Sequence, residues 1–522
     1  MSQTRREFLL NAGVLGVGGV VGLSSISNLF GKNFLKGSPL SARKKNVLFI
    51  PVDDLRTQLG CFGHSKMISP NIDRLAGRGV IFDRAYCQQP ICMATRASLL
   101  SGYRPDHANI YSCKSVKELI PDALTINKHF ESNGYQLWAT GKVYHYPSDH
   151  KAQFGNNYHL AKGNWVGRGY VSEEAIKIVS EYSTENENST DDDTGKQDER
   201  RGPAYESPDV LDNAYGDGIQ TEMAIEQLEK FSKSDKPFFM AVGYRKPHLP
   251  FCAPKKYWDM YNPDDLKLAN NPFLPKGATE FTYDNFNELR NYHGIPKDKN
   301  PLPDEIAVNI IHGYYACVSY TDAQIGKLLD TLDRLDLTKD TVIVLWGDHG
   351  WKLGEHGMWC KHTPFELDAH VPLIISDPDM NMKGERINSM AEFVDIYPTL
   401  CALCGIDIPN HLEGDNLVPA IHDPKSEIKQ AAFTQWPKSN RENPDKVMTA
   451  YSMVTDRYRY IEWTHNKSEK VLARELYDHK VDPDENENIV EYADIKEIVE
   501  QLSKKLEGGK GWKNFRPKKV VH

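Results

Sequence analysis

The chain has 522 residues, 40% of them hydrophobic and 10% aromatic, which is too much apolar material for a disordered protein. With 63 basic and 72 acidic residues the formal net charge is -9, and no long basic run is present, so we expect no nucleic-acid partner. Nine irregularly spaced cysteines are too few for a disulfide-dependent scaffold of this size.

The N-terminus carries the pattern of an export signal. An Arg5-Arg6 pair precedes a weakly apolar, glycine-rich stretch at residues 10–26, which is typical of a signal for the twin-arginine (Tat) translocase. A membrane anchor is the alternative, but a spanning helix needs about 20 strongly apolar residues. We therefore expect residues 1–30 to be a Tat signal peptide, residues 31–45 to be a linker, and the mature protein to be periplasmic or secreted.

Short apolar runs alternate with helical patterns along most of the remaining chain. The runs that predict buried strands are Asn46–Val52, Gln136–Thr140, Pro237–Gly243, Thr341–Trp346 and Val371–Ser376. Helical patterns occur between them at Ser69–Gly77, Ala224–Phe231 and His312–Leu335. Strands that alternate with helices predict an α/β domain with a largely parallel sheet, which we place at residues 46–438.

Two polar segments interrupt this pattern. Tyr182–Asp209 is acidic and has few apolar residues, so it is predicted to be a solvated insertion. Pro263–Pro303 is rich in proline and asparagine and is predicted to be a second excursion over the surface.

The C-terminal part has a different pattern. After a polar break near Trp436–Pro444, Thr449–Thr455 and Tyr458–Trp463 have the pattern of antiparallel strands, and Ile495–Leu506 has that of a final helix. We expect residues 439–522 to form a smaller α+β subdomain with an antiparallel sheet.

Four of the apolar runs lead into reactive side chains. These are Asp53 and Asp54, Lys142 and His145, Lys246 and His248, and Asp348 and His349. Singly each is weak evidence, because an Asp-Asp pair is more often a turn or a helix cap and a lone histidine is more often structural. Open α/β sheets bind ligands at the carboxyl ends of their strands, however, so we expect these four groups to converge on one site.

The most informative segment runs from Pro90 to Asp106. Cys92 stands four residues before Arg96, and Leu-Leu-Ser-Gly follows at residues 99–102. This segment resembles the signature of the sulfatase family, in which the cysteine is oxidised to formylglycine (3-oxoalanine). Further matching motifs, in family order, are Asp53-Asp54, Gly141–His145, Lys246–Phe251, Gly347–Trp351, Gly354–Gly357, Trp359–Lys361 and Glu475–Asp478.

The resemblance covers roughly residues 46–488 and is closest to the iduronate-2-sulfatase-like branch. It implies an alkaline phosphatase-like α/β fold with a large mixed sheet, mostly parallel, flanked by helices.

The resemblance also implies a metal site. Attack on a sulfate ester, already an anion, builds further charge on its oxygens and on the leaving group, and a hard divalent cation held by carboxylates suits that chemistry. The implied ion is Ca²⁺, one per chain, with Mg²⁺ or another divalent ion as alternatives because imidazole is an uncommon Ca²⁺ ligand. The expected ligands are Asp53, Asp54, Asp348, His349 and an oxygen of the modified Cys92.

The family mechanism gives roles to the other motif residues. One hydroxyl of the hydrated formylglycine attacks sulfur, and deprotonation of the other then expels sulfate. By resemblance, Arg96 orients this side chain, and Lys142 and Lys361 hold sulfate oxygens. His248 is expected to protonate the leaving oxygen, and His145 to assist the elimination.

The motif departs from the common family pattern at Ala94, where proline is usual. Some maturation enzymes require that proline, so the sequence leaves open which enzyme converts Cys92. The expected protein partners are a formylglycine-generating enzyme or an anaerobic sulfatase-maturating enzyme, and the Tat translocase. The expected substrate is a sulfated saccharide.

Three functions fit these residues. The first is a sulfuric ester hydrolase acting on a sulfated carbohydrate, either a glycosaminoglycan or an algal polysaccharide such as ulvan. The second is a phosphodiester or phosphonate hydrolase of the same superfamily. The third is an inactive sulfoglycan-binding protein that holds its ligand through Arg96, Lys142 and Lys361. A binding protein has no use for His145 together with His248, which favours an enzyme.

Two further cations follow the predicted nucleophile helix. Arg104 and His107 are candidates for binding a uronate carboxylate, with a surface or supporting role as the alternative.

Overall fold

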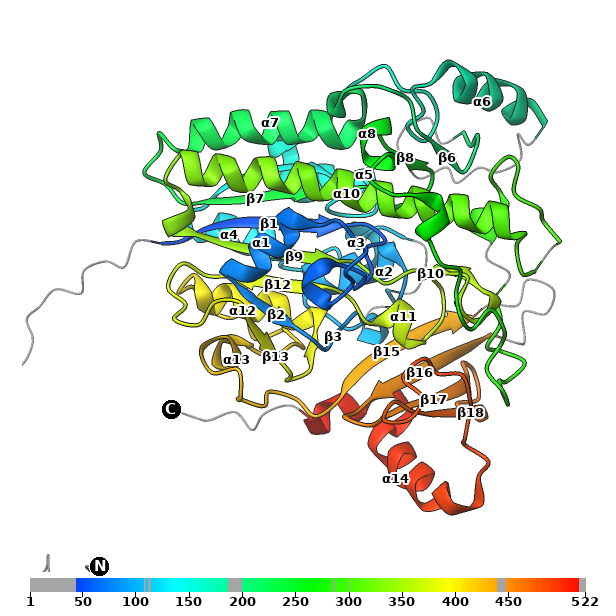
Figure 1. Cartoon of the computed structure of the whole chain (residues 1–522). Coiled ribbons are helices and arrows are strands. Elements are labelled where there is room, and N and C mark those ends of the chain that lie inside the picture. The colour runs from blue at the N-terminus through cyan, green and yellow to red at the C-terminus, as the bar shows by residue number, and fades with distance from the viewer. Residues whose placement is uncertain are drawn as a thin grey trace, which may run out of the picture. The chain divides into compact units, whose positions relative to one another are not determined.

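An eight-stranded mixed sheet forms the centre of the fold (Figure 1). The structure, a computed structural model, describes residues 44–107, 109–110, 114–185, 200–284, 287–298, 300–438 and 447–515. The strand order is β13-β2-β12-β9-β1-β7-β4-β5. The bounds are β1 (Asn46–Val52), β2 (Val80–Phe82), β4 (Gln136–Gly141), β5 (Tyr158–His159), β7 (Phe238–Gly243), β9 (Thr341–Gly347), β12 (Leu373–Ser376) and β13 (Glu385–Ile387).

The directions of the strands confirm the predicted fold class. Within this sheet β12 runs antiparallel to β9 and β2, and the other neighbouring pairs are parallel. The sheet is therefore large, mixed and mostly parallel. The predicted strand at Val371–Ser376 is the one that runs in the opposite direction.

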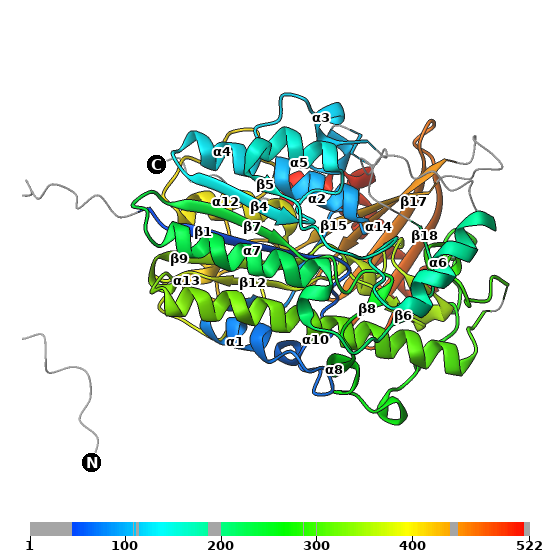
Figure 2. The same cartoon turned by 90° about the horizontal axis from the view of Figure 1, so that it is seen from above.

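The sheet is buried on both faces, which explains why its strands are continuous apolar runs. Every residue of β1 is buried; Leu48 and Ile50 pack into one core, and Val47 and Phe49 pack into another. Helices α1 (Pro70–Arg78), α7 (Gly216–Phe231) and α10 (Asp304–Arg334) contribute to the first core. The second core includes α2 (Cys92–Ser101), α4 (Ile126–Ser132), α5 (Pro147–Phe154), α12 (Ile396–Leu403) and α13 (Val418–His422). Figure 2 shows α7 and α10 lying along the sheet.

Helix α10 starts earlier than the predicted helix at His312–Leu335. Pro303 precedes it, and Asp304 and Glu305 occupy its first turn. Proline just before a helix and acidic residues in its first turn both favour a helix start, because the amino end of a helix carries partial positive charge.

Shorter elements complete the fold. Outside the C-terminal part, the remaining strands form two-stranded pairs. These pairs are β3 (Ala85–Tyr86) with β14 (Ala391–Glu392), β6 (Tyr205–Glu206) with β8 (Phe251–Cys252), and β10 (Lys352–Leu353) with β11 (Trp359–Cys360). The remaining helices in this part are α3 (Val116–Leu119), α6 (Glu173–Glu185), α8 (Lys255–Trp258), α9 (Asn287–Arg290) and α11 (Glu366–Ala369).

The first part of the segment Pro263–Pro303, residues 263–280, is mostly exposed, as its composition predicted, whereas its last part reaches the core. Leu289 and Tyr292 are each 1% exposed and belong to the core below the sheet. The structure describes the predicted insertion at Tyr182–Asp209 except for residues 186–199. The last part of this segment forms β6.

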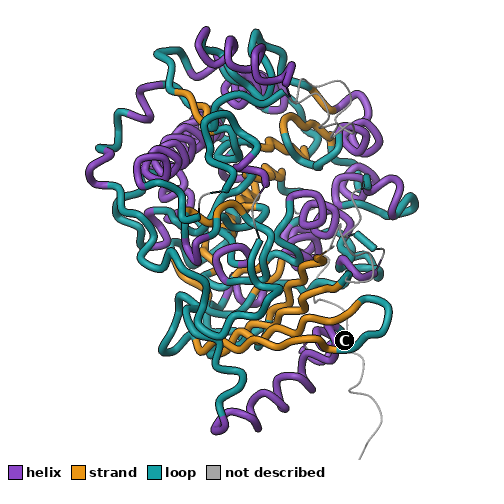
Figure 3. Tube along the Cα trace, turned by 90° about the vertical axis from the view of Figure 1, so that its right-hand side faces the viewer, coloured by secondary structure: helices purple, strands orange, loops and turns teal. Residues whose placement is uncertain are grey.

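A four-stranded antiparallel sheet forms the C-terminal part. Its strands are β15 (Ala432–Lys438), β16 (Met448–Val454), β17 (Tyr458–His465) and β18 (Val471–Asp478), in that order. Helix α14 (Lys496–Leu506) packs on this sheet through a separate small core (Figures 1 and 3). The subdomain was predicted to start at residue 439, but its first strand, β15, lies before that residue.

The predicted signal peptide and nearly all of the predicted linker, residues 1–43, lie outside the described residues. Among the residues that the structure describes, no helix combines the length and apolar character needed to cross a membrane.

A buried ion-pair cluster joins the small sheet to the rest of the chain. Arg459 on β17 contacts the carboxylate of Glu366 on α11, and its Nε lies 2.6 Å from a carboxylate oxygen of Glu485. The same guanidinium donates hydrogen bonds to the Pro364 carbonyl at 3.0 Å and to the Ser452 hydroxyl at 2.9 Å. Since Arg459 and Glu485 are each 1% exposed, each charge depends on the other for stabilisation.

We expect Arg459→Ala to lower the free energy of unfolding by about 3 kcal/mol, because it removes the arginine charge that stabilises the buried Glu485 carboxylate and leaves His479 as its remaining partner. The control is Arg457→Ala, which removes a 50% exposed arginine paired with Asp478 and is expected to change stability little, because solvent screens an exposed ion pair. Urea unfolding followed by circular dichroism measures both variants. Equal losses would mean that the buried cluster does not stabilise the junction.

Candidate active site

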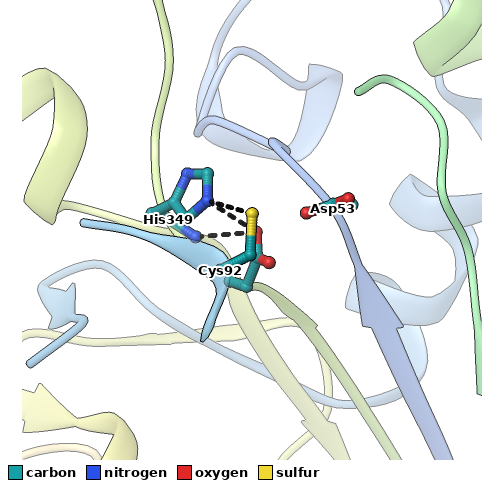
Figure 4. Close-up of side chains that lie close together, drawn as sticks. Asp53, Cys92 and His349 are labelled. Carbon is teal, nitrogen blue, oxygen red and sulfur yellow. Dashed lines mark hydrogen bonds and ion pairs between the residues drawn. The ribbon is translucent and has the colours of Figure 1, made fainter. Parts of the chain in front are cut away.

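Polar side chains gather where β1 and β9 end. The two strands are parallel with Val52 beside Gly347, so the residues that follow, Asp53 and Asp348, leave the sheet side by side. Both are fully buried. Figure 4 shows Cys92 between His349 and Asp53 in this view, with His349 close to the sulfur.

Asp54 has a backbone conformation that is uncommon for a residue with a side chain. Its φ is 57°, in the left-handed region. Hydrogen bonds on both sides hold it there: its N–H donates to Asp348 Oδ1 at 3.0 Å, and its carbonyl accepts from the Tyr314 hydroxyl at 2.9 Å. Such strain persists only where the surroundings enforce it, and it is found mostly at functional sites.

His349 presents one ring nitrogen to this cluster. Its Nδ1 lies 3.0 Å from the Gly350 carbonyl, which can only accept, so Nδ1 carries the proton of the neutral ring. The Nε2 lone pair then faces Cys92 Sγ at 3.2 Å, Asp54 Oδ1 at 3.4 Å and Asp348 Oδ1 at 3.5 Å. A histidine fixed in this way by a second hydrogen bond is typical of a metal ligand.

Cys92 is the first residue of α2, and all of that helix is buried. Burial, together with the nearby Asp53 carboxylate, raises the pKa of the Cys92 thiol to about 12. Thiolate, not thiol, is the reactive form of cysteine. As an unmodified side chain, Cys92 would therefore be a poor nucleophile at neutral pH.

The residues present fit a divalent cation. Asp53, Cys92, Asp348 and His349 each offer one ligand atom, and these four atoms all lie within 4.8 Å of one another. Among the described residues, Asp53 Oδ1 is buried and has no hydrogen-bond partner. A buried carboxylate oxygen without a donor is unusual, and a cation supplies what is missing. The two carboxylates suit Ca²⁺ or Mg²⁺, whereas a thiolate and an imidazole suit softer ions such as Zn²⁺.

Arg96 connects the cluster to the neighbouring strands. It is fully buried, and its Nε donates to Asp348 Oδ2 at 2.8 Å. Its Nη1 donates to the carbonyls of Lys142 and Val143, just after β4. Its Nη2 lies 3.7 Å from Asp53 Oδ1. In this structure Arg96 therefore positions Asp348 and the Lys142 backbone.

Two lysines pair with the aspartates. Lys142 Nζ contacts Asp53 Oδ2, and Lys361 Nζ lies 3.1 Å from Asp54 Oδ1. Burial alone would favour the neutral amines, but the neighbouring carboxylates raise the pKa of both lysines above the usual value. Both side chains thus remain cationic, as binding of sulfate oxygens requires.

His248 and Glu288 form a pair that the sequence analysis missed. His248 Nδ1 lies 2.6 Å from the Leu249 carbonyl, and its Nε2 lies 3.0 Å from Glu288 Oε1. The other oxygen of Glu288 lies 2.9 Å from Lys361 Nζ. Glu288 stands on the short helix α9, in a segment without a motif, so no sequence signal marked it.

His145 lies further from the carboxylate cluster. It lines a cavity of about 440 Å³ together with Lys142, and its Nδ1 is buried without a hydrogen-bond partner among the described residues. Burial, with Lys142 nearby, lowers the pKa of His145 well below the usual value, so the ring is neutral at physiological pH. A neutral imidazole can accept a proton.

The structure thus brings the predicted site residues into one region, while their chemical roles stay predictions. Arg104 and His107, the candidates for binding a uronate carboxylate, are not part of this region. Arg104 makes two hydrogen bonds with the buried Glu392 carboxylate, at 2.8 and 2.6 Å, and His107 Nδ1 lies 3.1 Å from Glu413. The structure therefore favours a supporting role for Arg104, the alternative to binding a uronate carboxylate.

Comparison with known families and proteins gives matches along most of the chain. The profile of the family described as Sulfatase matches residues 45–406, and the profile described as N-sulphoglucosamine sulphohydrolase, C-terminal, matches residues 354–510. The iduronate 2-sulfatase of Homo sapiens is 32% identical over 536 residues, which cover 90% of this chain and 94% of that protein.

Solved structures show the same fold. The phosphonate monoester hydrolase of Agrobacterium radiobacter has a TM-score of 0.66 at 22% identity, covering 89% of this chain and 95% of that one. A protein solved in complex with its substrate D-glucosamine-2-N,6-O-disulfate has a TM-score of 0.66 at 21% identity, covering 90% and 98%.

We expect the metal-stripped protein to bind about one Ca²⁺ per chain and Asp53→Asn to bind it much more weakly. Loss of an outer hydrogen-bond partner alone typically costs about 10–100-fold in metal affinity, so loss of a ligand charge should cost at least as much. Isothermal titration with Ca²⁺ measures the affinity without any enzymatic assay.

The control for this titration is Asp322→Asn. Asp322 is another buried carboxylate, but its oxygens already accept backbone N–H groups of Asn71 and Ile72. Its replacement should leave Ca²⁺ affinity unchanged. Equal affinity of Asp53→Asn and the unmodified protein would contradict the proposed cation site.

Proposed function

The chain belongs to the sulfatase family, and we propose that it removes sulfate from a sulfated carbohydrate with a nucleophile made from Cys92 and a bound divalent cation. One observation above all supports this proposal. Cys92 lies at the buried start of α2, 3.2 Å from His349, inside a cluster of carboxylates that includes one unpartnered oxygen. A cysteine kept only for packing would not need these neighbours.

Two groups absent from the unmodified chain complete the proposed site. Conversion of Cys92 to formylglycine would supply an aldehyde, and addition of water to it gives two hydroxyls on one carbon, which lets sulfate be accepted and later expelled. A cation held by Asp53, Asp54, Asp348 and His349, with Ca²⁺ the expected ion, supplies positive charge for the oxygens that become more negative.

The lysines and Arg96 provide the fixed positive charge. Lys142 and Lys361 are already cationic and already held by Asp53 and Asp54, so little rearrangement is needed when sulfate oxygens approach. Arg96 keeps Asp348 and the Lys142 backbone in place through its hydrogen bonds. The two lysines would therefore bind the anion, and Arg96 would position the groups around it.

The two histidines move protons at different steps. His248, whose Nδ1 is held by the Leu249 carbonyl, would carry a proton on Nε2 towards the leaving oxygen. Burial and the nearby Lys361 lower the pKa of His248 to about 4, so the protonated ring depends on a neighbouring carboxylate. Glu288 faces that nitrogen at 3.0 Å, and we assign it the role of positioning the ring and stabilising its charged form. His145, neutral and close to Lys142, would accept the proton whose loss expels sulfate.

The proposed substrate is a polysaccharide. A family relative that matches 90% of this chain at 32% identity is an iduronate 2-sulfatase, which favours a sulfated glycosaminoglycan. A sulfated algal polysaccharide such as ulvan is the other candidate, and release of sulfate from defined oligosaccharides of each type separates the two. We also propose export through the Tat translocase, on the basis of the Arg5-Arg6 pattern.

In active protein, Cys92 should be found as formylglycine, because the unmodified thiol is buried and has a raised pKa. Peptide mass spectrometry of the α2 peptide detects the conversion, and Cys92→Ala should abolish release of sulfate from 4-nitrophenyl sulfate. Cys87→Ala is the control, since Cys87 is also buried but offers no ligand atom to the carboxylate cluster. Full activity with an unmodified thiol at Cys92 would refute the proposed nucleophile.

Loss of His248 should matter most when the leaving group is poor. A sugar alkoxide must be protonated as the S–O bond breaks, whereas 4-nitrophenolate leaves almost unaided, and general acid catalysis contributes about 10²–10⁴-fold where it is needed. We expect His248→Ala to lower kcat/KM far more on a sulfated saccharide than on the aryl sulfate. An equal loss on both substrates would mean that His248 binds sulfate instead.

Glu288→Gln tests whether Glu288 acts through His248. It should lower kcat/KM on the saccharide in the unmodified protein but have little further effect in a His248→Ala background, because coupled residues are not additive. If Glu288→Gln has the same effect in both backgrounds, Glu288 acts through Lys361. The proposal that Glu288 positions His248 would then be wrong.

A further inference from the structure

The thiol of Cys92 lies among groups that bind metal ions, and the chain as synthesised carries this thiol before any conversion. Its Sγ lies 3.2 Å from His349 Nε2, and Figure 4 shows the ring beside the sulfur. The ligand atoms of Asp53 and Asp348 belong to the same group, in which all four atoms lie within 4.8 Å of one another. A thiol, an imidazole and two carboxylates are therefore available to a single ion.

The spacing of these atoms suits tetrahedral coordination. Bonds of about 2.0–2.3 Å to nitrogen, oxygen and sulfur place neighbouring ligand atoms of a tetrahedron roughly 3.3–3.6 Å apart. His349 Nε2 lies 3.2 Å from Cys92 Sγ and 3.5 Å from Asp348 Oδ1. The backbone N–H groups of Asp54 and His349 hold that oxygen in place. A small movement of the side chains is therefore enough for an ion to bond to all of them.

Two buried acceptor atoms in this group point to a cation. Asp53 is fully buried, and its Oδ1 has no hydrogen-bond partner among the described residues, since Arg96 Nη2 is 3.7 Å away. Lys142 contacts the other oxygen, Oδ2. His349 is also fully buried, and the Gly350 carbonyl fixes its proton on Nδ1, so the lone pair of Nε2 faces the group. One cation satisfies both acceptors.

The ligand types decide which ion fits the unconverted chain. Ca²⁺ takes about six to eight oxygen ligands, whereas this group supplies two carboxylates together with a sulfur and a nitrogen. Zn²⁺ usually has four ligands in a tetrahedron, and thiolate and imidazole are among the ligands that bind it best. The sulfur of Cys92 therefore favours Zn²⁺, and replacement of that sulfur by oxygen would favour Ca²⁺.

We propose that the unconverted chain binds a Zn²⁺ ion through a thiolate, an imidazole and two carboxylates, those of Cys92, His349, Asp53 and Asp348. The ion replaces the thiol hydrogen, which leaves the protein as a proton, and no electron is transferred. In the converted chain the sulfur is gone and the preferred ion becomes Ca²⁺. This change of ion rests on the proposed function, whereas zinc binding by the thiol form rests on the geometry of the group alone.

The test uses the full chain made by cell-free synthesis without a maturation enzyme, with the thiol at Cys92 verified by peptide mass spectrometry. Metal-stripped protein is titrated with Zn²⁺ and with Ca²⁺ in a calorimeter, in the presence of a phosphine reductant. We expect about one Zn²⁺ per chain, bound more tightly than Ca²⁺. Loss of an outer hydrogen-bond partner alone typically costs about 10–100-fold in metal affinity, so Cys92→Ser should lower Zn²⁺ affinity at least that much.

Co²⁺ reports the sulfur directly. It binds to sites that suit Zn²⁺, and a bond from cobalt to thiolate sulfur gives an absorption band in the near ultraviolet. We expect the band in the unconverted chain and none in Cys92→Ser. Cys87→Ser is the matched control and should keep the band, because Cys87 is also buried but donates to the Asp368 carbonyl and offers no ligand atom to the group. Thermal unfolding verifies that each variant is folded.

A second group of side chains is the alternative zinc site. Glu366, His479 and Glu485 also offer ligand atoms within 4.8 Å of one another, but Arg459 contacts both carboxylates. If Zn²⁺ binds there, His479→Ala lowers the affinity and Cys92→Ser does not, and the proposal is wrong. A Co²⁺ band of equal strength in Cys92→Ser and the unconverted chain would also overturn it.

The outcomes separate zinc binding from the proposed function. If the unconverted chain binds Zn²⁺ through Cys92 but active protein carries no formylglycine, the proposed function fails and the zinc site is supported. If converted protein releases sulfate but the thiol form does not bind Zn²⁺ through Cys92, the zinc site fails and the proposed function is supported. Converted protein that still binds Zn²⁺ more tightly than Ca²⁺ would contradict the change of ion.

Discussion

The whole site depends on how the charge of Arg96 is stabilised. Its guanidinium is fully buried, and it donates to Asp348 after β9 and to backbone carbonyls after β4, while its own helix begins with Cys92. A charge buried this deeply costs several kcal/mol unless carboxylates and carbonyls surround it. The ends of two strands and the start of one helix must therefore close together around one side chain. The position of Cys92 relative to Asp348 follows from that requirement.

Around this centre, opposite charges alternate. Lys142 pairs with Asp53, and Lys361 lies between Asp54 and Glu288. Each lysine is held in place before a ligand arrives, which is the preorganisation that makes charge effective in a water-poor site.

The sequence allowed the strands and their reactive ends to be predicted because each strand is an apolar run followed by a charged residue, as at Asp53 and Asp348. The direction of β12 could not be predicted, because a buried apolar run has the same pattern in parallel and antiparallel pairs. Glu288 lies in a segment with neither motif nor periodicity, and only folding brings it to Lys361. Arg104 is the opposite case: it follows the nucleophile helix closely in sequence, yet Glu392 neutralises it through a pairing that only the folded chain forms.

The burial of α2 has a consequence for how the protein is made. Cys92 is 3% exposed, and every residue of its helix is buried. A modifying enzyme must hold the cysteine and its neighbours, including Ala94, in its own active site, and the folded chain offers no such access. Under the proposed function, conversion of Cys92 therefore has to precede the folding of α2. A chain whose helix α2 folds before that step would keep the unmodified thiol.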